Sequence, residues 1–127
     1  LTQLALNNGS YAGKTYWKSA VESQFIAPLK SDDSYALGWR RSGAKHSYAP
    51  FGHYASNLAY GHTGWTGTVT LIDPKYNLII VLLTNKKHSP YRNGQFAGDG
   101  FATGKYAPII DLIYQALPET QSFSTTK

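Results

Sequence analysis

Apolar residues recur at helical spacing at the start of the chain. Leu1, Leu4 and Ala5 share one helical face, and the Asn-Asn-Gly at 7–9 is typical of a helix end, because these residues accept the left-handed conformation of a C-terminal cap. A second, weaker helical pattern covers residues 15–28 and closes at a proline. We therefore expect two short helices in this part of the chain.

The pattern then changes to the two-residue period of a strand. Tyr35, Leu37 and Trp39 alternate with smaller or polar residues, so residues 35–41 predict a strand with these three side chains on one face. The polar stretch 42–47 indicates a turn or hairpin tip.

Two further strands follow an irregular, aromatic segment. Residues 65–74 alternate again, and 73–77 contain a proline at a favoured turn position. Residues 78–85 are a nearly continuous apolar run, which is typical of a strand buried on both faces. We expect these two strands to form an antiparallel hairpin.

The last part of the chain combines a long loop with a helix. Residues 85–104 are rich in glycine and asparagine, and loops of this length tend to be functional or mobile. Residues 105–117 predict a helix with Pro108 in its first turn. The order of elements predicts an α+β fold, an antiparallel β-sheet flanked by helices, in one unit over 1–117 with a flexible tail at 118–127.

Composition and charge narrow the possible functions. The longest apolar run, 78–83, is far shorter than the roughly 18 residues that a membrane span needs. The net charge is +5, but adjacent basic pairs occur only at 40–41 and 86–87, so we predict no nucleic-acid partner. The absence of cysteine excludes disulfides and cysteine-based zinc sites.

The sequence contains no motif that supports a metal site or a phosphate-binding loop. The four histidines, at 46, 53, 62 and 88, include no pair at the helical spacing of a zinc protease. Gly100 and Gly104 are separated by three residues rather than the four of a phosphate loop, and a tyrosine follows Lys105. We expect no metal site and no cofactor.

The candidate chemistry lies in the sequence Gly-His-Thr-Gly-Trp-Thr-Gly at 61–67, where His62, Thr63 and Gly64 are predicted to open a strand. A glycine at a strand edge lets a substrate backbone lie close, because it has no side chain. The ring of His62 and the hydroxyl of Thr63 could then hold a carboxylate or a reacting acyl group. A structural turn that contains a histidine by chance would have the same sequence.

Residues 35–41 and 60–90, taken together, resemble the C-terminal part of the serine β-lactamase and penicillin-binding-protein superfamily. The similarity is greatest to the class C-like branch of D-Ala carboxypeptidases, esterases and cell-wall amidases, and it extends over roughly residues 1–117. It implies a partial β-lactamase/transpeptidase-like fold in which a His-Thr-Gly triplet replaces Lys-Thr-Gly.

The resemblance also implies roles for single residues. His62 and Thr63 would bind or orient the substrate, and Gly64 would complete this third catalytic motif. The backbone N–H of Trp65 would supply half of the oxyanion hole. With histidine in place of lysine, an amidase, carboxypeptidase or esterase is expected at least as much as a β-lactamase.

The family mechanism needs two further motifs, Ser-x-x-Lys and Tyr-x-Asn. Literal matches occur at 42–45 and 91–93, but their order and spacing relative to the triplet are wrong. Gly43 also opposes the helix that would bring Ser42 and Lys45 together. We therefore expect no nucleophile in this chain.

These expectations describe a C-terminal fragment of a bacterial serine hydrolase that acts on cell-wall peptide amides, β-lactams or esters. The chain opens at Leu1 without an initiator Met and shows no signal peptide. Its partner would be the upstream part of the same protein, which carries the serine, and its location extracellular or at the cell surface. This chain alone would be inactive.

Two alternatives remain open at this point: a non-catalytic binding module of the same ancestry, and an unrelated small α+β interaction domain. The fragment predicts exposed apolar surface with aggregation, or a domain-swapped or nicked oligomer. An unrelated domain predicts a monomer that folds cooperatively.

Overall fold

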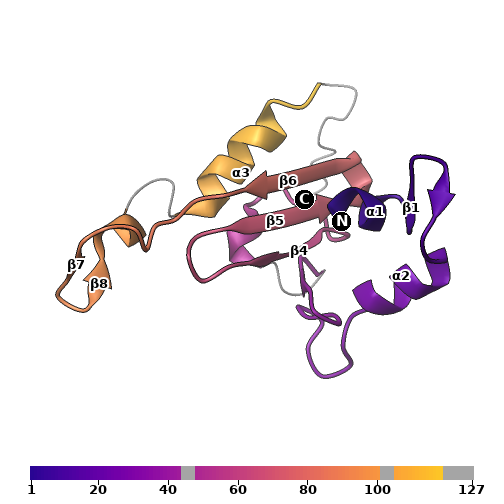
Figure 1. Cartoon of the computed structure of the whole chain (residues 1–127), viewed down its shortest axis with the longest axis horizontal. Helices are drawn as coiled ribbons and strands as arrows, with labels where there is room; N and C mark the ends of the chain where they lie inside the picture. The colour runs from indigo at the N-terminus through magenta and orange to yellow at the C-terminus, as the bar shows by residue number, and fades with distance from the viewer. Residues whose placement is uncertain (44–47, 101–104, 119–127) are drawn as a thin grey trace.

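A computed structural model describes residues 1–43, 48–100 and 105–118 and shows the expected α+β architecture, a helix-flanked antiparallel sheet (Figure 1). The helices of these residues are α1 (Thr2–Leu6), α2 (Ser19–Ile26) and α3 (Tyr106–Gln115), with single 3₁₀ turns at η1 (Ala49–Phe51), η2 (Pro74–Tyr76) and η3 (Ala97–Gly100). The strands are β1 (Ser10–Tyr11), β2 (Lys14–Thr15), β3 (Arg40–Arg41), β4 (Tyr60–Thr63), β5 (Val69–Asp73), β6 (Leu78–Leu82), β7 (Tyr91–Arg92) and β8 (Gln95–Phe96).

The main sheet has the order β3-β4-β5-β6, and every neighbouring pair is antiparallel. The hairpin β5–β6 turns through η2, where Asn77 adopts the left-handed conformation, which confirms the hairpin predicted around 73–77. Two small hairpins, β1–β2 and β7–β8, lie outside this sheet. Figure 1 shows β7–β8 standing well away from the sheet, beyond the end of β6.

The two faces of the sheet carry different cores. Leu71 and Ile80 pack with Ile110 and Tyr114 of α3 in the larger hydrophobic cluster. On the opposite face of β5, Ile72 is fully buried in a smaller cluster with the following residues: Ala5 of α1 and Tyr60 of β4. Alternation along a strand therefore sends neighbouring side chains into separate cores.

The end of α1 agrees with the sequence prediction. The Gly9 N–H donates to the carbonyl of Leu4 at 2.7 Å, and Asn8 and Gly9 both have positive φ. A side chain at Gly9 would also collide with the backbone carbonyl of Trp17. The glycine is thus required both by the helix cap and by close packing.

The strand predicted over 35–41 is wrong in most of its length. Tyr35 pairs with Arg40 in an antiparallel bridge, and the Ala36 N–H donates to the Trp39 carbonyl at 2.9 Å, so the chain reverses between them. Gly38 has φ of +78°, a conformation that glycine adopts without cost. The alternating side chains therefore flank a turn, and only β3 joins the sheet.

The burial predicted for 78–85 is also wrong. Ile80 is buried, whereas Val81 is 51% and Leu83 is 75% exposed. β6 is an edge strand, and α3 covers only one of its faces. An apolar run can thus mark a strand whose second face is uncovered in this chain.

Further expectations differ from the structure or fall partly outside the described residues. The triplet ends the separate strand β4, and the strand predicted from 65 begins only at Val69. The loop predicted over 85–104 contains β7, β8 and η3, with 101–104 outside the described residues. Residues 44–47 of the predicted hairpin tip and 119–127 of the predicted tail also lie outside them.

Candidate functional site

The triplet lies where β4 meets a tight turn. His62 pairs with Thr70 and Thr63 pairs with Val69 on β5. The Gly64 N–H then donates to the Thr68 carbonyl at 2.8 Å and closes the connection. The three residues are therefore held by backbone pairing at the end of an inner strand, a rigid base for a binding site.

Two glycines of this segment are required by the sheet itself. A Cβ on Gly61 would collide with the backbone carbonyl of Thr70 on the neighbouring strand. A Cβ on Gly64 would meet the hydroxyl of Thr68 across the turn. The fold itself therefore requires glycine at position 64. From the sequence, we had explained this glycine only by the close approach of a substrate.

The His62 ring is exposed and has a defined tautomer. Its Nδ1 lies 2.8 Å from the carbonyl oxygen of Thr63. A carbonyl only accepts hydrogen bonds, so Nδ1 must donate. When the ring is neutral, Nε2 therefore carries a lone pair and is available as a hydrogen-bond acceptor.

The hydroxyl of Thr63 is shared with a residue that sequence reasoning missed. The Tyr48 hydroxyl lies 2.9 Å from Thr63 Oγ1. The Arg40 guanidinium lies 3.7 Å from the ring centre of Tyr35 and 5.1 Å from that of Tyr48. Tyr48 is 15 positions from Thr63, and no local motif connects them, so only the fold could reveal this pair.

Trp65 follows the triplet with its side chain 74% exposed. Within the described residues, neither its backbone N–H nor that of the next residue, Thr66, has a hydrogen-bond partner, whereas the N–H groups of Gly64 and Gly67 do. An N–H without a partner beside a polar triplet can donate to an anionic oxygen. The structure therefore leaves this group available for the role that the resemblance implies.

The described residues of the two literal motif matches lie in non-helical chain and in the β7–β8 hairpin. Ser42 is 4% exposed, and its N–H donates to the Ala59 carbonyl at 2.9 Å in non-helical chain. Lys45 lies outside the described residues. Tyr91 lies in β7 and is 62% exposed, and Asn93 forms the turn after it.

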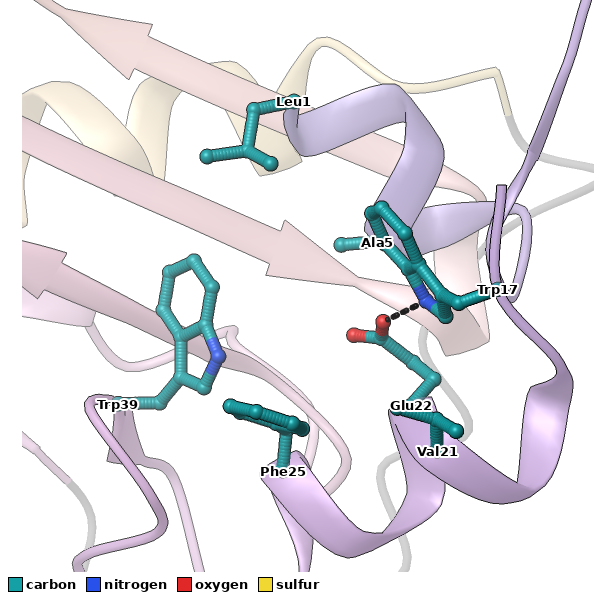
Figure 2. Close-up of a pocket in the computed structure, with 7 residues that line it drawn as sticks. All are labelled: Leu1, Ala5, Trp17, Val21, Glu22, Phe25 and Trp39. Carbon is teal, nitrogen blue, oxygen red and sulfur yellow. Dashed lines mark hydrogen bonds between the residues drawn. The ribbon is translucent and has the colours of Figure 1, made fainter.

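A separate apolar pocket of about 330 Å³ lies between α1, α2 and Trp39 (Figure 2). Its lining residues are Leu1, Ala5, Trp17, Val21, Glu22, Phe25 and Trp39. Glu22 accepts hydrogen bonds from Trp17 Nε1 at 2.7 Å and from the Tyr60 hydroxyl at 3.4 Å. Burial, and then the neighbouring Glu22, raises the pKa of Tyr60.

The pocket lies on the face of the sheet that carries the His62 side chain, whereas Thr63 contacts Tyr48 on the other side. Tyr60 and His62 are two positions apart on β4, so their side chains leave the same face, and the Trp39 ring packs against Tyr60 with centres 5.5 Å apart. The triplet itself does not line this pocket. The hollow is therefore an apolar surface beside the candidate site.

A buried carboxylate fixes the elements behind the site. Asp73, fully buried, accepts from the Ser56 hydroxyl at 2.6 Å, the Ser56 N–H at 2.9 Å and the Tyr114 hydroxyl at 2.7 Å. These bonds tie α3 and the segment before β4 to the sheet. Burial and the hydrogen bond to Asp73 raise the pKa of Tyr114.

The described residues contain no group of three His, Cys, Asp or Glu side chains that could hold a metal ion. None of the helices described is long and apolar enough to cross a membrane.

These features define a class: a partial β-lactamase-like α+β fold, with an antiparallel sheet between helices. The family model described as Beta-lactamase matches residues 4–101, and the chain belongs to this family. Membership excludes the unrelated small interaction domain.

Two bacterial relatives match this chain over nearly its whole length. It is 50% identical to the N-acetylmuramyl-L-alanine amidase of Bacillus subtilis over 92% of this chain and 28% of the relative. It is 39% identical to a protein of Escherichia coli named "Putative D-alanyl-D-alanine carboxypeptidase", over 94% of this chain and 29% of the relative. The chain thus spans less than a third of the length of these relatives.

Proposed function

We propose that this chain is the C-terminal portion, over about residues 1–117, of a bacterial serine hydrolase of the class C-like branch that acts on cell-wall peptide amides, β-lactams or esters. The observation that carries the proposal is the polar triplet at the end of β4, followed at once by the unpaired N–H of Trp65. The names of the relatives support a substrate derived from peptidoglycan.

In this mechanism a serine from the upstream part attacks the carbonyl carbon of the substrate. The carbonyl oxygen becomes anionic and accepts hydrogen bonds from the Trp65 N–H and from the serine's own N–H. This anionic intermediate then collapses, expels the amine or alcohol and leaves an acyl-enzyme, which water hydrolyses. The chain thus contributes part of the oxyanion hole and no nucleophile.

His62 and Thr63 bind and orient the substrate. With Nδ1 bonded to the Thr63 carbonyl, the neutral His62 ring presents Nε2 as an acceptor for a substrate N–H, and a protonated ring presents a donor for a carboxylate. The Thr63 hydroxyl, bonded to Tyr48, has its direction restricted by that bond. These fixed hydrogen-bond directions favour a single orientation of the bound substrate.

The partner is the upstream part of the same protein. It packs against the face of the sheet that this chain covers only in part. Val81 and Phe25 are 51% and 50% exposed, and the pocket between α1 and α2 is apolar (Figure 2). Exposed apolar surface on this scale is typical of a face that another segment covers. A substrate in the bacterial wall places the enzyme outside the cell or at its surface.

The test uses the full-length protein, its His62→Ala variant and a fluorescent penicillin or phosphonate probe. We expect slower serine labelling in the variant, by about tenfold to a hundredfold, with an unchanged melting temperature, because His62 is exposed and orients the acyl donor. His53→Ala is the matched control, since that histidine is 86% exposed and pairs with Asp111 of α3.

An unchanged labelling rate in the His62→Ala protein would contradict the assigned role. If no serine of the wild-type full-length protein takes the probe while ligand still binds, the non-catalytic module replaces the hydrolase. The 127-residue chain alone should stay unlabelled by mass spectrometry, and an adduct on Ser42 would show that its rejection as nucleophile was wrong.

A further inference from the structure

A buried carboxylate lines the apolar pocket between α1 and α2. Glu22 is only 5% exposed and is the one buried residue of α2, whereas Val21 and Phe25 of the same helix are 41% and 50% exposed. A helix that packs on its own chain normally buries apolar side chains and exposes charged ones. The reversed pattern of α2 indicates a contact with a group that this chain does not supply.

The charge of Glu22 has no ionic partner among the described residues. Its carboxylate accepts hydrogen bonds from Trp17 Nε1 at 2.7 Å and from the Tyr60 hydroxyl at 3.4 Å, and both donors are neutral. No lysine, arginine or histidine in the described part of the chain pairs with it. Because a carboxylate removed from water is stabilised mainly by a cation, two neutral donors, one of them distant, compensate this charge only in part.

The free acceptor positions of the carboxylate lie among aromatic rings. Figure 2 shows the Glu22 carboxylate between the Trp17 ring on one side and the Phe25 and Trp39 rings on the other. Each carboxylate oxygen has two lone pairs, and Trp17 and Tyr60 bind different oxygens, so both oxygens can accept again. The pocket of about 330 Å³ has room for a complete long side chain.

This combination of groups suits a guanidinium. Aromatic faces attract cations, and a guanidinium stacks on rings while it donates two parallel hydrogen bonds to a carboxylate. An ammonium is more strongly hydrated, so the same apolar pocket favours it less. The apolar side chains of Leu1 and Val21 at the pocket suit the methylene stem of an arginine. A purely apolar group would leave the charge of Glu22 buried and unpaired.

We propose that an arginine side chain from the upstream part of the protein enters this pocket and pairs with Glu22. The inference rests on the proposed function for the existence of that part, and it adds the chemistry of one contact between the two parts. The match covers only 28% of the Bacillus subtilis relative, so most of a protein of that length lies outside this chain. Through the Tyr60 hydroxyl, the pair would also contact β4, the strand that ends in the triplet.

The test is a double-mutant cycle in the full-length protein. Each arginine is replaced in turn by methionine, both in the wild-type background and together with Glu22→Gln, and urea unfolding gives the equilibrium constant of unfolding. Glutamine keeps an oxygen that can accept from Trp17, so this background removes the charge and retains the shape. For one upstream arginine, we expect the replacement to raise the unfolding constant about tenfold or more further in the wild-type background than in the Glu22→Gln background.

Two further backgrounds locate the contact. Asp99→Asn is the matched control, because this carboxylate already pairs with Lys86 at 3.1 Å and Lys87 at 3.3 Å, and the same arginine should not couple to it. Trp39→Leu keeps the carboxylate and removes one ring face, so the arginine should couple to it by about twofold or more. If the Glu22→Gln protein does not fold, the Trp39→Leu cycle decides, and no coupling there overturns the inference.

The outcomes separate this inference from the proposed function. If no upstream arginine couples to Glu22, the contact is overturned. Coupling confined to Arg40, Arg41 or Arg92, together with a dimer in analytical ultracentrifugation, would assign the pocket to a second copy of the chain and also overturn it. Both results leave serine labelling by the penicillin probe intact. A coupled upstream arginine in a protein whose serines take no probe supports the contact, while the hydrolase assignment fails.

Discussion

Single atoms decide what the triplet can offer a substrate. Nδ1 of His62 and Oγ1 of Thr63 already have partners within the chain, the Thr63 carbonyl and the Tyr48 hydroxyl. The groups left are Nε2 of His62 and the N–H of Trp65. Because two of these four polar groups already have partners, the site is pre-oriented, which lowers the entropy cost of binding.

The buried Tyr114 predicts a loss of stability in alkali. Burial and Asp73 raise its pKa above the ordinary value of about 10, so above that pH the unfolded chain releases a proton that the folded chain keeps. This contribution to folding is present below about pH 10 and is lost as the pH rises further.

Tyr114→Phe should lower the free energy of unfolding near neutral pH by about 1–3 kcal/mol, because Asp73 loses a donor. The same change should reduce the further loss of stability above about pH 10. Urea unfolding near neutral pH and above about pH 10 measures both effects on the free energy of unfolding, with the exposed Tyr16→Phe as control. An equally steep alkaline loss in both variants would assign it to other groups, Tyr60 first among them.

Among the elements, the pair β4–β5 positions the site, and it depends on a glycine. Gly61 lies opposite Leu71, and any side chain on it would meet the backbone of Thr70. Because backbone cannot move aside as a flexible side chain does, the strands would have to separate.

Gly61→Ala should therefore destabilise the chain by about 1–3 kcal/mol or more and displace the triplet. Thermal unfolding checks the stability, and acylation of the full-length protein checks the site. Gly100→Ala is the control, because a Cβ there meets no atom of the described residues within 4 Å. Equal melting temperatures for the two variants would show that the strands tolerate the side chain.

At the scale of the whole molecule, the unequal covering of the sheet is the main feature. α3 packs against one face, whereas the other face keeps exposed apolar residues at the edge strand. Figure 1 shows α1 near one end of the sheet and α2 beyond it, so these helices do not cover the whole face. The full-length protein would bury this surface against its upstream part.

The 127-residue chain alone should therefore self-associate and bind a hydrophobic dye. Replacing Val81 and Leu83 together by threonine should reduce both effects, because it removes apolar area that is 51% and 75% exposed in those residues. Leu112→Thr on α3, at 65% exposure, is the control and should change them less. Analytical ultracentrifugation showing a monodisperse monomer of the unsubstituted chain would contradict this expectation.

Local signals were sufficient for the features that depend on near neighbours. The cap at Asn8 and Gly9, the β5–β6 hairpin and the helix near the C-terminus all follow from short-range sterics and apolar spacing, which the sequence carries directly. The order of the triplet and the strands along the chain also indicated the family. The roles of His62, Thr63, Gly64 and Trp65 remain predictions.

The tertiary structure decided what depends on distant partners. Alternation at 35–39 does not reveal that Gly38 reverses the chain, and the apolar run of β6 does not reveal that one face lacks a cover. The contact of Tyr48 with Thr63, and that of Trp65 with Phe96 on the distant β7–β8 hairpin, arise only when the chain folds. Sequence by itself determined the family and the elements set by local sterics and apolar spacing, because those signals are local or ordered along the chain. The remaining elements and the neighbours of each functional group were set by packing across it.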